Sequence, residues 1–265
     1  MPTACYQSRE PSQLMRQFES KTVLITGTGG GLGRVAAYQF AADGAIVHGC
    51  DINEITNQET LRSLKADGLS MMPSTVDLGD SDAVSGWVNS AAKKSGNIDV
   101  LINNASAARF STMDIITVED WQYTIRNELD SLFYTSKFAW PHLKKNGGVI
   151  INIASVAAHH GSTAAGNTAH TATKGAILAM TRQLAIEGAP YNIRAVSISP
   201  GVIMTPGTAA ILSDPAVHET LKKNIPLGRA GQPSDIVSIM MFAASEAAGY
   251  WTGSDLIVDG GMTAK

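Results

Sequence analysis

The first indication of the fold is the stretch Val23-Leu24-Ile25-Thr26-Gly27-Thr28-Gly29-Gly30-Gly31-Leu32-Gly33. An apolar run passes through a glycine-rich turn into a segment with the composition of a helix. Glycines allow a tight turn there and let backbone N–H groups approach a pyrophosphate at the N-terminus of the helix, where the helix dipole favours anions. The stretch therefore predicts a strand, a phosphate-binding turn and a helix in succession.

Short β-rich runs alternate with longer helical stretches along the rest of the chain. We expect strands at residues 22–26, 45–50, 71–75, 100–102, 149–153, 195–198 and 256–258. We expect helices at residues 32–42, 56–66, 81–94, 118–145, 171–188 and 233–244. Continuously apolar strands are typical of parallel sheets covered on both faces. The pattern predicts an α/β fold, a single doubly wound Rossmann-type parallel sheet of about seven strands with helices on both faces.

Composition limits the domain organisation and the partners. The chain has 265 residues, 44% of them hydrophobic, and a net charge of -3. We expect one dinucleotide-binding catalytic domain over residues 21–265 after a polar extension over residues 1–20. A near-neutral charge without a basic cluster argues against a nucleic-acid partner. No apolar run reaches the ~18–20 residues that span a bilayer, and no apolar core of a signal peptide is present, so we expect a soluble cytoplasmic protein without a membrane partner.

A carboxylate, Asp51, stands at the end of the second expected strand, where it can bind the hydroxyls of an adenosine ribose. A carboxylate there repels a 2′-phosphate, and no Arg or Lys lies between Gly27 and Gly33 to offset it. NAD(H) is therefore favoured over NADP(H). NADP(H) stays open, because Asp51 could turn away while Arg34 or another base compensates.

The spacing Thr26-Gly27-x-x-x-Gly31-x-Gly33 resembles the first motif of the short-chain dehydrogenase/reductase family, and the resemblance covers about residues 21 to 261. Other matching segments are Asp77-Leu78, Asn103-Asn104-Ala105 with Ser106 in place of a glycine, Ser199 to Thr205, and Asp255 to Gly261. The resemblance implies a cofactor site formed by Gly27, Gly30, Gly31, Leu32, Gly33, Asp51, Asp77, Leu78, Asn104, Ala105, Lys174, Pro200, Gly201, Ile203 and Thr205.

The resemblance also implies a catalytic set, in which a serine polarises the substrate oxygen, a tyrosine moves the proton and a lysine binds the ribose. Ser155 and Lys174 resemble the serine and the lysine. His170 stands four residues before Lys174, at the position of the tyrosine. Its separation from Ser155, fifteen residues, is longer than is usual in the family.

The family also places an asparagine on its long central helix to anchor a proton-relay water. Aligning Leu129 and Phe133 with the family pattern puts Glu128 at that site. Asn127 serves instead if the helix is locally shifted. Both alternatives stay open at this point.

His170 has two interpretations. An imidazole titrates near neutral pH and suits proton transfer, yet the ring reaches less far from its Cα than a phenol. His170 is therefore either a proton carrier or a residue that fills space and bonds to its neighbours. His159 and His160 are interpreted as surface residues of the loop before it, and no metal site is expected, because the three histidines lack ligands at a recognisable spacing.

These residues favour an NAD(P)-dependent short-chain oxidoreductase with an atypical catalytic set. It would transfer hydride to or from a small, partly apolar substrate: a ketone or alcohol, or an imine, iminium or activated alkene that needs no tyrosine proton. The alternatives are a non-redox isomerase, dehydratase or cyclisation catalyst on the same pocket, and a cofactor-binding protein without catalysis. The resemblance further implies self-association, as a dimer or homotetramer.

Overall fold

The computed structural model describes residues 16–161 and 166–265, which form a seven-stranded parallel sheet in the order β3-β2-β1-β4-β5-β6-β7. The strands are β1 (Thr22–Thr26), β2 (Ile46–Asp51), β3 (Met72–Thr75), β4 (Val100–Asn103), β5 (Gly148–Ile153), β6 (Ile193–Pro200) and β7 (Asp255–Val258). The strand order reverses between β1 and β4. In open parallel sheets, ligands bind at the carboxyl ends of the strands beside such a reversal. The predicted fold class is confirmed.

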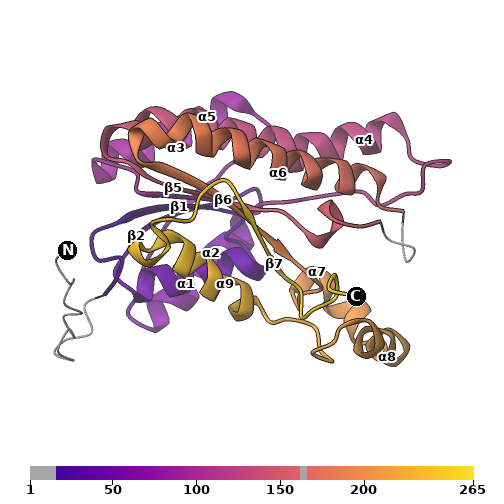
Figure 1. Cartoon of the computed structure of the whole chain (residues 1–265). Coiled ribbons are helices and arrows are strands. Elements are labelled where there is room, and N and C mark those ends of the chain that lie inside the picture. The colour runs from indigo at the N-terminus through magenta and orange to yellow at the C-terminus, as the bar shows by residue number, and fades with distance from the viewer. Residues whose placement is uncertain (1–15, 162–165) are drawn as a thin grey trace, which may run out of the picture.

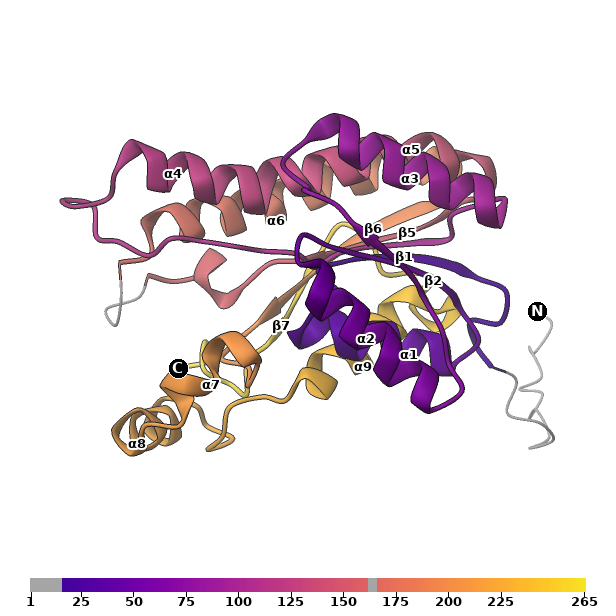
Figure 2. The same cartoon turned by 180° about the vertical axis from the view of Figure 1, so that it is seen from behind.

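Helices cover both faces of the sheet (Figure 1). One layer holds α1 (Gly31–Ala42), α2 (Glu54–Ala66) and α9 (Pro233–Ala244). The other holds α3 (Ser81–Ser95), α4 (Val118–Ile125), α5 (Ser131–Asn146) and α6 (Thr168–Gly188), and the view from behind confirms the two layers (Figure 2). Within the described part of the chain, every helix is too short or too polar to cross a lipid bilayer.

Two short helices follow β6, in a part of the chain where no helix was expected. They are α7 (Pro206–Leu212) and α8 (Pro215–Asn224), and they project from the edge of the molecule beyond the main layers (Figure 1). Each begins with a proline in its first turn, after Thr205 and Asp214 respectively as the N-cap residues. Proline suits the first helical position because it has a fixed φ and the missing N–H would have no partner there.

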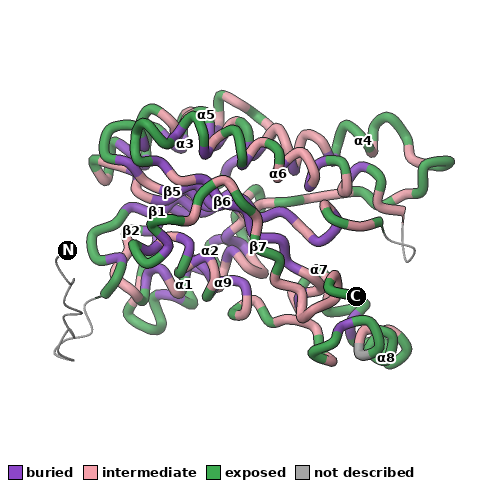
Figure 3. Tube along the Cα trace, in the orientation of Figure 1, coloured by how far each residue is buried: buried purple, intermediate pink, exposed green. Residues whose placement is uncertain are grey.

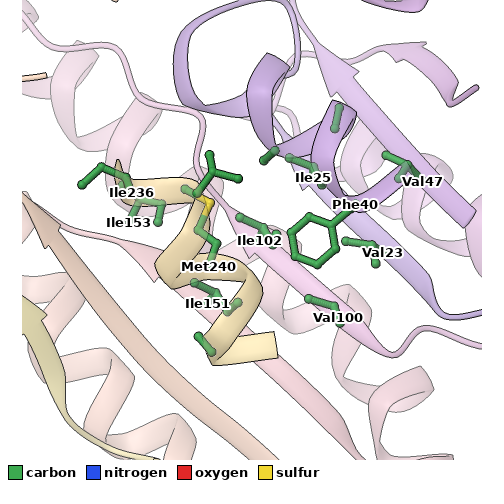
Figure 4. Close-up of a cluster of buried hydrophobic side chains, with 14 of the residues drawn as sticks. Val23, Ile25, Phe40, Val47, Val100, Ile102, Ile151, Ile153, Ile236 and Met240 are labelled. Carbon is green, nitrogen blue, oxygen red and sulfur yellow. The ribbon is translucent and has the colours of Figure 1, made fainter. Parts of the chain in front are cut away.

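The main hydrophobic core lies between the sheet and the layer of α1 and α9 (Figure 4). Phe40 of α1 and Met240 of α9 are fully buried against Ile25, Ile102 and Ile151 of the central strands. Burial of one such side chain contributes roughly 1.5–3 kcal/mol. The central strands are accordingly buried along most of their length (Figure 3), which fixes the carboxyl ends that carry the candidate site.

The start of the folded part differs from the predicted boundary at residue 21. Residues 1–15 of the expected extension lie outside the described residues. Phe18, however, is 2% exposed, and its ring lies 4.8 Å from that of Phe40. The backbone N–H of Phe18 also donates to the carbonyl of Asp43 at 3.1 Å. The packed domain therefore begins before residue 21.

Candidate active site

A cleft of about 490 Å³ opens at the carboxyl ends of the strands next to the reversal in strand order. The predicted cofactor residues on its wall are Gly27, Gly30, Gly31, Leu32, Asp51, Asp77, Leu78, Asn104, Ala105 and Thr205. The rest of the wall is formed by Asn127 and by residues that were not expected there from the sequence: Ile52, Val76, Ser106, Ala107, Pro206 and Gly207. Residues from six separate segments thus share one cavity.

The glycine turn leaves the N-terminus of α1 open to the cleft. Gly27 and Gly31 adopt φ values of +76° and +52°, in the left-handed region that favours glycine. The N-cap residue of α1, Gly30, has no side chain to bond the first N–H groups of the helix. Gly33 lies beneath the wall, because a Cβ there would stand 2.0 Å from the carbonyl oxygen of Gly27. The turn therefore fits a phosphate group, with Gly33 providing the close packing.

Asp51 and Arg34 both bond to the glycine turn. Asp51 accepts from the backbone N–H groups of Gly29, at 2.8 Å, and Asn53, at 2.9 Å. The guanidinium of Arg34 donates to the hydroxyl of Thr60 at 2.9 Å and to the carbonyl of Gly29 at 2.7 Å. Asp51 is held on the cleft wall, whereas Arg34 is engaged with the base of the turn and α2.

The predicted residues that precede Thr205 pack against other parts of the chain. Pro200 ends β6, and a Cβ on Gly201 would stand 2.8 Å from the Cα of Asp259. Ile203 is 8% exposed and borders a second cavity of about 220 Å³. Pro200, Gly201 and Ile203 are absent from the residues that line the main cleft, so among the described residues this segment reaches it through Thr205.

A buried network of amides and hydroxyls fixes the end of β4. The amide of Asn103 donates to the side-chain oxygen of Asn152 at 2.9 Å, and the Thr135 hydroxyl donates to Asn103 at 2.6 Å. The backbone N–H of Asn104 donates to the Thr26 hydroxyl at 2.9 Å. Buried polar groups that are fully bonded hold a unique geometry. The network therefore sets the position of the Asn104-Ala105-Ser106 segment on the cleft wall.

The expected helix at residues 118–145 is interrupted by a π-helical turn, η1 (Arg126–Asp130). Such turns contain one extra residue and are frequent at functional sites. Glu128 points inward from η1 and is 2% exposed. Asn127 lines the cleft, and its amide donates to the carbonyl of Tyr123 at 2.8 Å. The two residues considered for one position thus face different surroundings.

Glu128 contacts His170 directly. Figures 1 and 2 show α4 and α6 side by side, and η1 and α6 contact each other. The Nδ1 atom of His170 lies 2.9 Å from Oε1 of Glu128 and 3.1 Å from Oε2. The His170 side chain is 15% exposed, and the Phe110 ring lies 5.5 Å from it, edge to face.

Three further groups surround the Glu128 carboxylate. The Ser106 hydroxyl donates to Oε1 at 2.5 Å, the Thr173 hydroxyl donates to Oε2, and Nζ of Lys174 lies 3.9 Å from Oε1. Burial raises the pKa of Glu128, but the bond with His170 and the charge of Lys174 outweigh it and lower the pKa to about 2. Glu128 is therefore ionised at neutral pH.

Lys174 of α6 reaches the end of β5, and Ser155 follows that strand in sequence. The Lys174 ammonium donates to the carbonyl of Ile153 at 3.1 Å. Burial lowers the pKa of Lys174, and the nearby Glu128 carboxylate opposes that shift. The Ser155 hydroxyl accepts from the backbone N–H of Ala157 at 3.1 Å, which caps the short helix η2 (Val156–Ala158).

His159 bonds across to the neighbouring strand. Its Nε2 atom lies 2.9 Å from Oδ2 of Asp255 and 3.4 Å from the hydroxyl of Ser199. His160 bonds the carbonyl of Gly161 through Nδ1 at 2.8 Å. Among the described residues, no group of three His, Cys, Asp or Glu side chains is arranged to hold a metal ion.

Two contacts of Glu128 were not assigned from the sequence. Ser106 was noted only as a departure from the family pattern, and Thr173 was not singled out at all. Thr173 follows His170 by three residues, the spacing that places two side chains on the same helix face. That spacing is the signal that could have indicated it.

The model of the enoyl-(acyl carrier protein) reductase family matches residues 27–263 of the chain. With the fold and the cleft described above, this match shows that the chain belongs to the short-chain dehydrogenase/reductase family of oxidoreductases. The expected oxidoreductase class is thereby confirmed.

The similar proteins include enzymes with different substrates. A 3-oxoacyl-[acyl-carrier-protein] reductase of Chlamydia pneumoniae is 38% identical over 244 residues, which cover 92% of this chain and 97% of the relative. The structure of a gluconate 5-dehydrogenase from Burkholderia cenocepacia in complex with NADP and tartrate has a TM-score of 0.88 at 30% identity, covering 95% and 98% of the two chains. A 7α-hydroxysteroid dehydrogenase complexed with NADH and 7-oxo glycochenodeoxycholic acid has a TM-score of 0.87 at 29% identity, covering 93% and 96%.

Proposed function

We propose that the chain is an NAD(H)-dependent oxidoreductase that transfers hydride to or from a small, partly apolar substrate. The observation that carries this proposal is the cleft of about 490 Å³, in which the open glycine turn, Asp51 and Thr205 share one wall. The turn fits a pyrophosphate, and Asp51 fits a ribose diol. Bound nicotinamide would supply the hydride acceptor or donor.

The preference for NAD(H) over NADP(H) is supported by two side chains. Asp51 keeps a carboxylate on the cleft wall, which repels the extra phosphate of NADP(H). Arg34, the basic residue that directly follows the glycine turn, already donates to Thr60 and Gly29. It would have to break those bonds to reach a phosphate. Because one solved relative binds NADH and another binds NADP, the family alone does not decide between the two cofactors.

We propose that His170 carries the substrate proton, with Ser155 polarising the reacting oxygen and Lys174 binding the ribose. The His170 ring bonds a buried carboxylate, the arrangement of histidine–carboxylate pairs that perform general acid–base catalysis. A ketone or alcohol uses this proton transfer. An iminium or strongly activated alkene accepts hydride without a proton on oxygen, and it would depend on His170 much less.

The test combines cofactor binding with turnover. Calorimetric titration of the purified chain should give saturable binding of NADH that is tighter than that of NADPH. A panel of small alcohols, ketones and cyclic imines should then change the nicotinamide absorbance with at least one substrate. Cofactor binding without turnover on the whole panel would contradict the proposed activity.

A non-redox reaction is the second candidate, because a buried carboxylate and a histidine form an acid–base pair that needs no hydride. An isomerase or dehydratase would convert its substrate with no net change in nicotinamide absorbance. Product analysis by mass spectrometry, run beside the absorbance assay, separates the two reactions.

A cytoplasmic location stays a prediction from the sequence.

We also propose that the chain self-associates as a homotetramer. Large apolar side chains remain exposed on the long helices and the last strand: Phe133, Ile186, Leu256 and Ile257. Exposed apolar groups on neighbouring elements are typical of subunit interfaces. Light scattering should give the mass of four chains, and a monomer would contradict this proposal.

A further inference from the structure

We propose that Glu128 is a positioning residue that fixes His170 in one tautomer, with Nδ1 protonated and Nε2 unprotonated. Ser106 and Thr173 hold the carboxylate for this task. The catalytic meaning of the inference rests on the proposed function. The tautomer itself is a property of the free protein and can be measured without a substrate.

Because Glu128 is buried, it differs from a catalytic base that contacts the substrate directly. Its side chain is 0% exposed, and both carboxylate oxygens accept hydrogen bonds. A substrate in the cleft therefore cannot reach the carboxylate without displacing its partners. His170 remains partly accessible at 15% exposure, so Glu128 acts through the imidazole.

The direction of the hydrogen bond follows from the charge of Glu128. An ionised carboxylate only accepts, so the ring nitrogen facing it must carry a proton. The hydroxyls of Ser106 and Thr173 donate to the two carboxylate oxygens, and Nζ of Lys174 lies 3.9 Å from Oε1, so these groups favour the ionised form independently of the imidazole. Nδ1 of His170 faces both oxygens, at 2.9 Å and 3.1 Å. Nε2 is then the ring nitrogen left with a lone pair.

The proton balance of the pair is complete. When a substrate O–H loses its proton, Nε2 of His170 accepts it, and the ring becomes an imidazolium that carries a proton on each nitrogen. Glu128 keeps its negative charge and balances the new positive charge, as a buried carboxylate does in other carboxylate–histidine pairs. In the reverse direction, the Nε2 proton returns to the oxygen. Glu128 is never protonated in either direction.

Ser106 and Thr173 prevent the carboxylate from rotating away. The Ser106 hydroxyl bonds Oε1, and the Thr173 hydroxyl bonds Oε2, so each oxygen has its own donor besides the imidazole. Lys174 adds positive charge 3.9 Å from Oε1. The three positions where the sequence departs from the family pattern, Ser106, Glu128 and His170, therefore make one connected group of side chains.

The direct test is nitrogen NMR of protein labelled with ¹⁵N-histidine, in the absence of substrate. His170→Gln identifies the signals of this histidine by their loss. The wild type at alkaline pH should give the pattern of a ring protonated on Nδ1. Glu128→Met, which keeps the bulk and removes the acceptor, should shift His170 toward the Nε2-protonated form. A wild-type ring protonated on Nε2 would overturn the inference, whether or not the variant folds.

A kinetic cycle tests the same link through activity. Glu128→Met should lower kcat at least about tenfold with little change in KM, since general acid–base catalysis contributes roughly 10²–10⁴-fold. In a His170→Gln background, Glu128→Met should leave kcat almost unchanged. An equal loss in both backgrounds would mean that Glu128 acts on another group, which contradicts the inference. A wild type without turnover but with the Nδ1-protonated ring would defeat the proposed function and leave the tautomer standing.

Discussion

The Nδ1 atom of His170 lies 2.9 Å from Oε1 of Glu128, although the two residues are 42 positions apart in the chain. The contact joins α6 to the π-helical turn between α4 and α5. It places a partly exposed imidazole on a buried, ionised carboxylate. Glu128 borders a small pocket together with Leu78 and Ala105, which also line the main cleft. The proposed proton transfer and the predictions below depend on this pair.

His170→Gln tests the proton carrier. The amide keeps polarity and similar bulk but does not transfer protons, so kcat for an alcohol or ketone should fall roughly 10²-fold or more. Affinity for NADH should stay within a few-fold of the wild type. His142→Gln is the matched control, because His142 bonds Asn89 and lies outside the cleft. Equal activity of the two variants on a carbonyl substrate would argue that His170 is structural.

Asp51→Ser tests the cofactor preference. Loss of the carboxylate removes the acceptor for the ribose hydroxyls and the repulsion of a 2′-phosphate. NADH affinity should fall about tenfold or more, because a hydrogen bond to a charged group contributes roughly 1.5–3 kcal/mol. NADPH affinity should rise. Asp67→Ser removes a carboxylate outside the cleft and should leave both affinities unchanged. Titrations of the variant with NADH and with NADPH test the prediction. An unchanged ratio of the two dissociation constants would contradict it.

Glu128 should couple stability to acid pH. Its pKa is about 2 in the folded protein, against an ordinary value of 4.5. A lowered pKa means that the stabilisation is fully present above about pH 4.5 and is lost as the pH falls toward 2. The free energy of unfolding of the wild type should therefore fall relative to that of Glu128→Gln over this window, by an amount on the order of 3 kcal/mol. Urea unfolding at a series of pH values measures the difference, and a constant difference would refute the coupling.

Gly33→Ala should damage the turn through packing. Its new Cβ would stand 2.0 Å from the carbonyl oxygen of Gly27, so the turn must shift. We expect a loss of roughly 1–3 kcal/mol in the free energy of unfolding and weaker binding of NADH. Gly86→Ala on α3 is the control, because its Cβ meets no atom within 4 Å. It should stabilise the protein by roughly 0.5–1 kcal/mol. Equal stability of both variants would contradict the steric account.

The sequence predicts the sheet because its central strands are buried on both faces and therefore read as apolar runs between helices. The turn from Gly27 to Gly33 could also be predicted, because its glycines directly follow the apolar strand in the sequence. The π-helical turn was not predicted, because one extra residue inside a helix leaves the apolar pattern nearly unchanged. The Ser106–Glu128–His170 group was not predicted either, as its members come from three distant segments. The cofactor contacts expected at Pro200, Gly201 and Ile203 stay a prediction, because these residues are not among those that line the cleft.

The most direct test of the proposed cofactor site and of the role of His170 is a crystal structure of the chain with its nicotinamide cofactor and a bound substrate or product. We expect the cofactor to fill the cleft between Gly27 and Thr205, with its ribose hydroxyls on Asp51. We also expect Nε2 of His170 to lie within about 2.6–3.2 Å of the reacting oxygen, directly or through one water, while Nδ1 stays on Glu128. A complex in which the cofactor lies elsewhere, or in which another side chain holds the reacting oxygen and His170 turns away, would contradict this expectation.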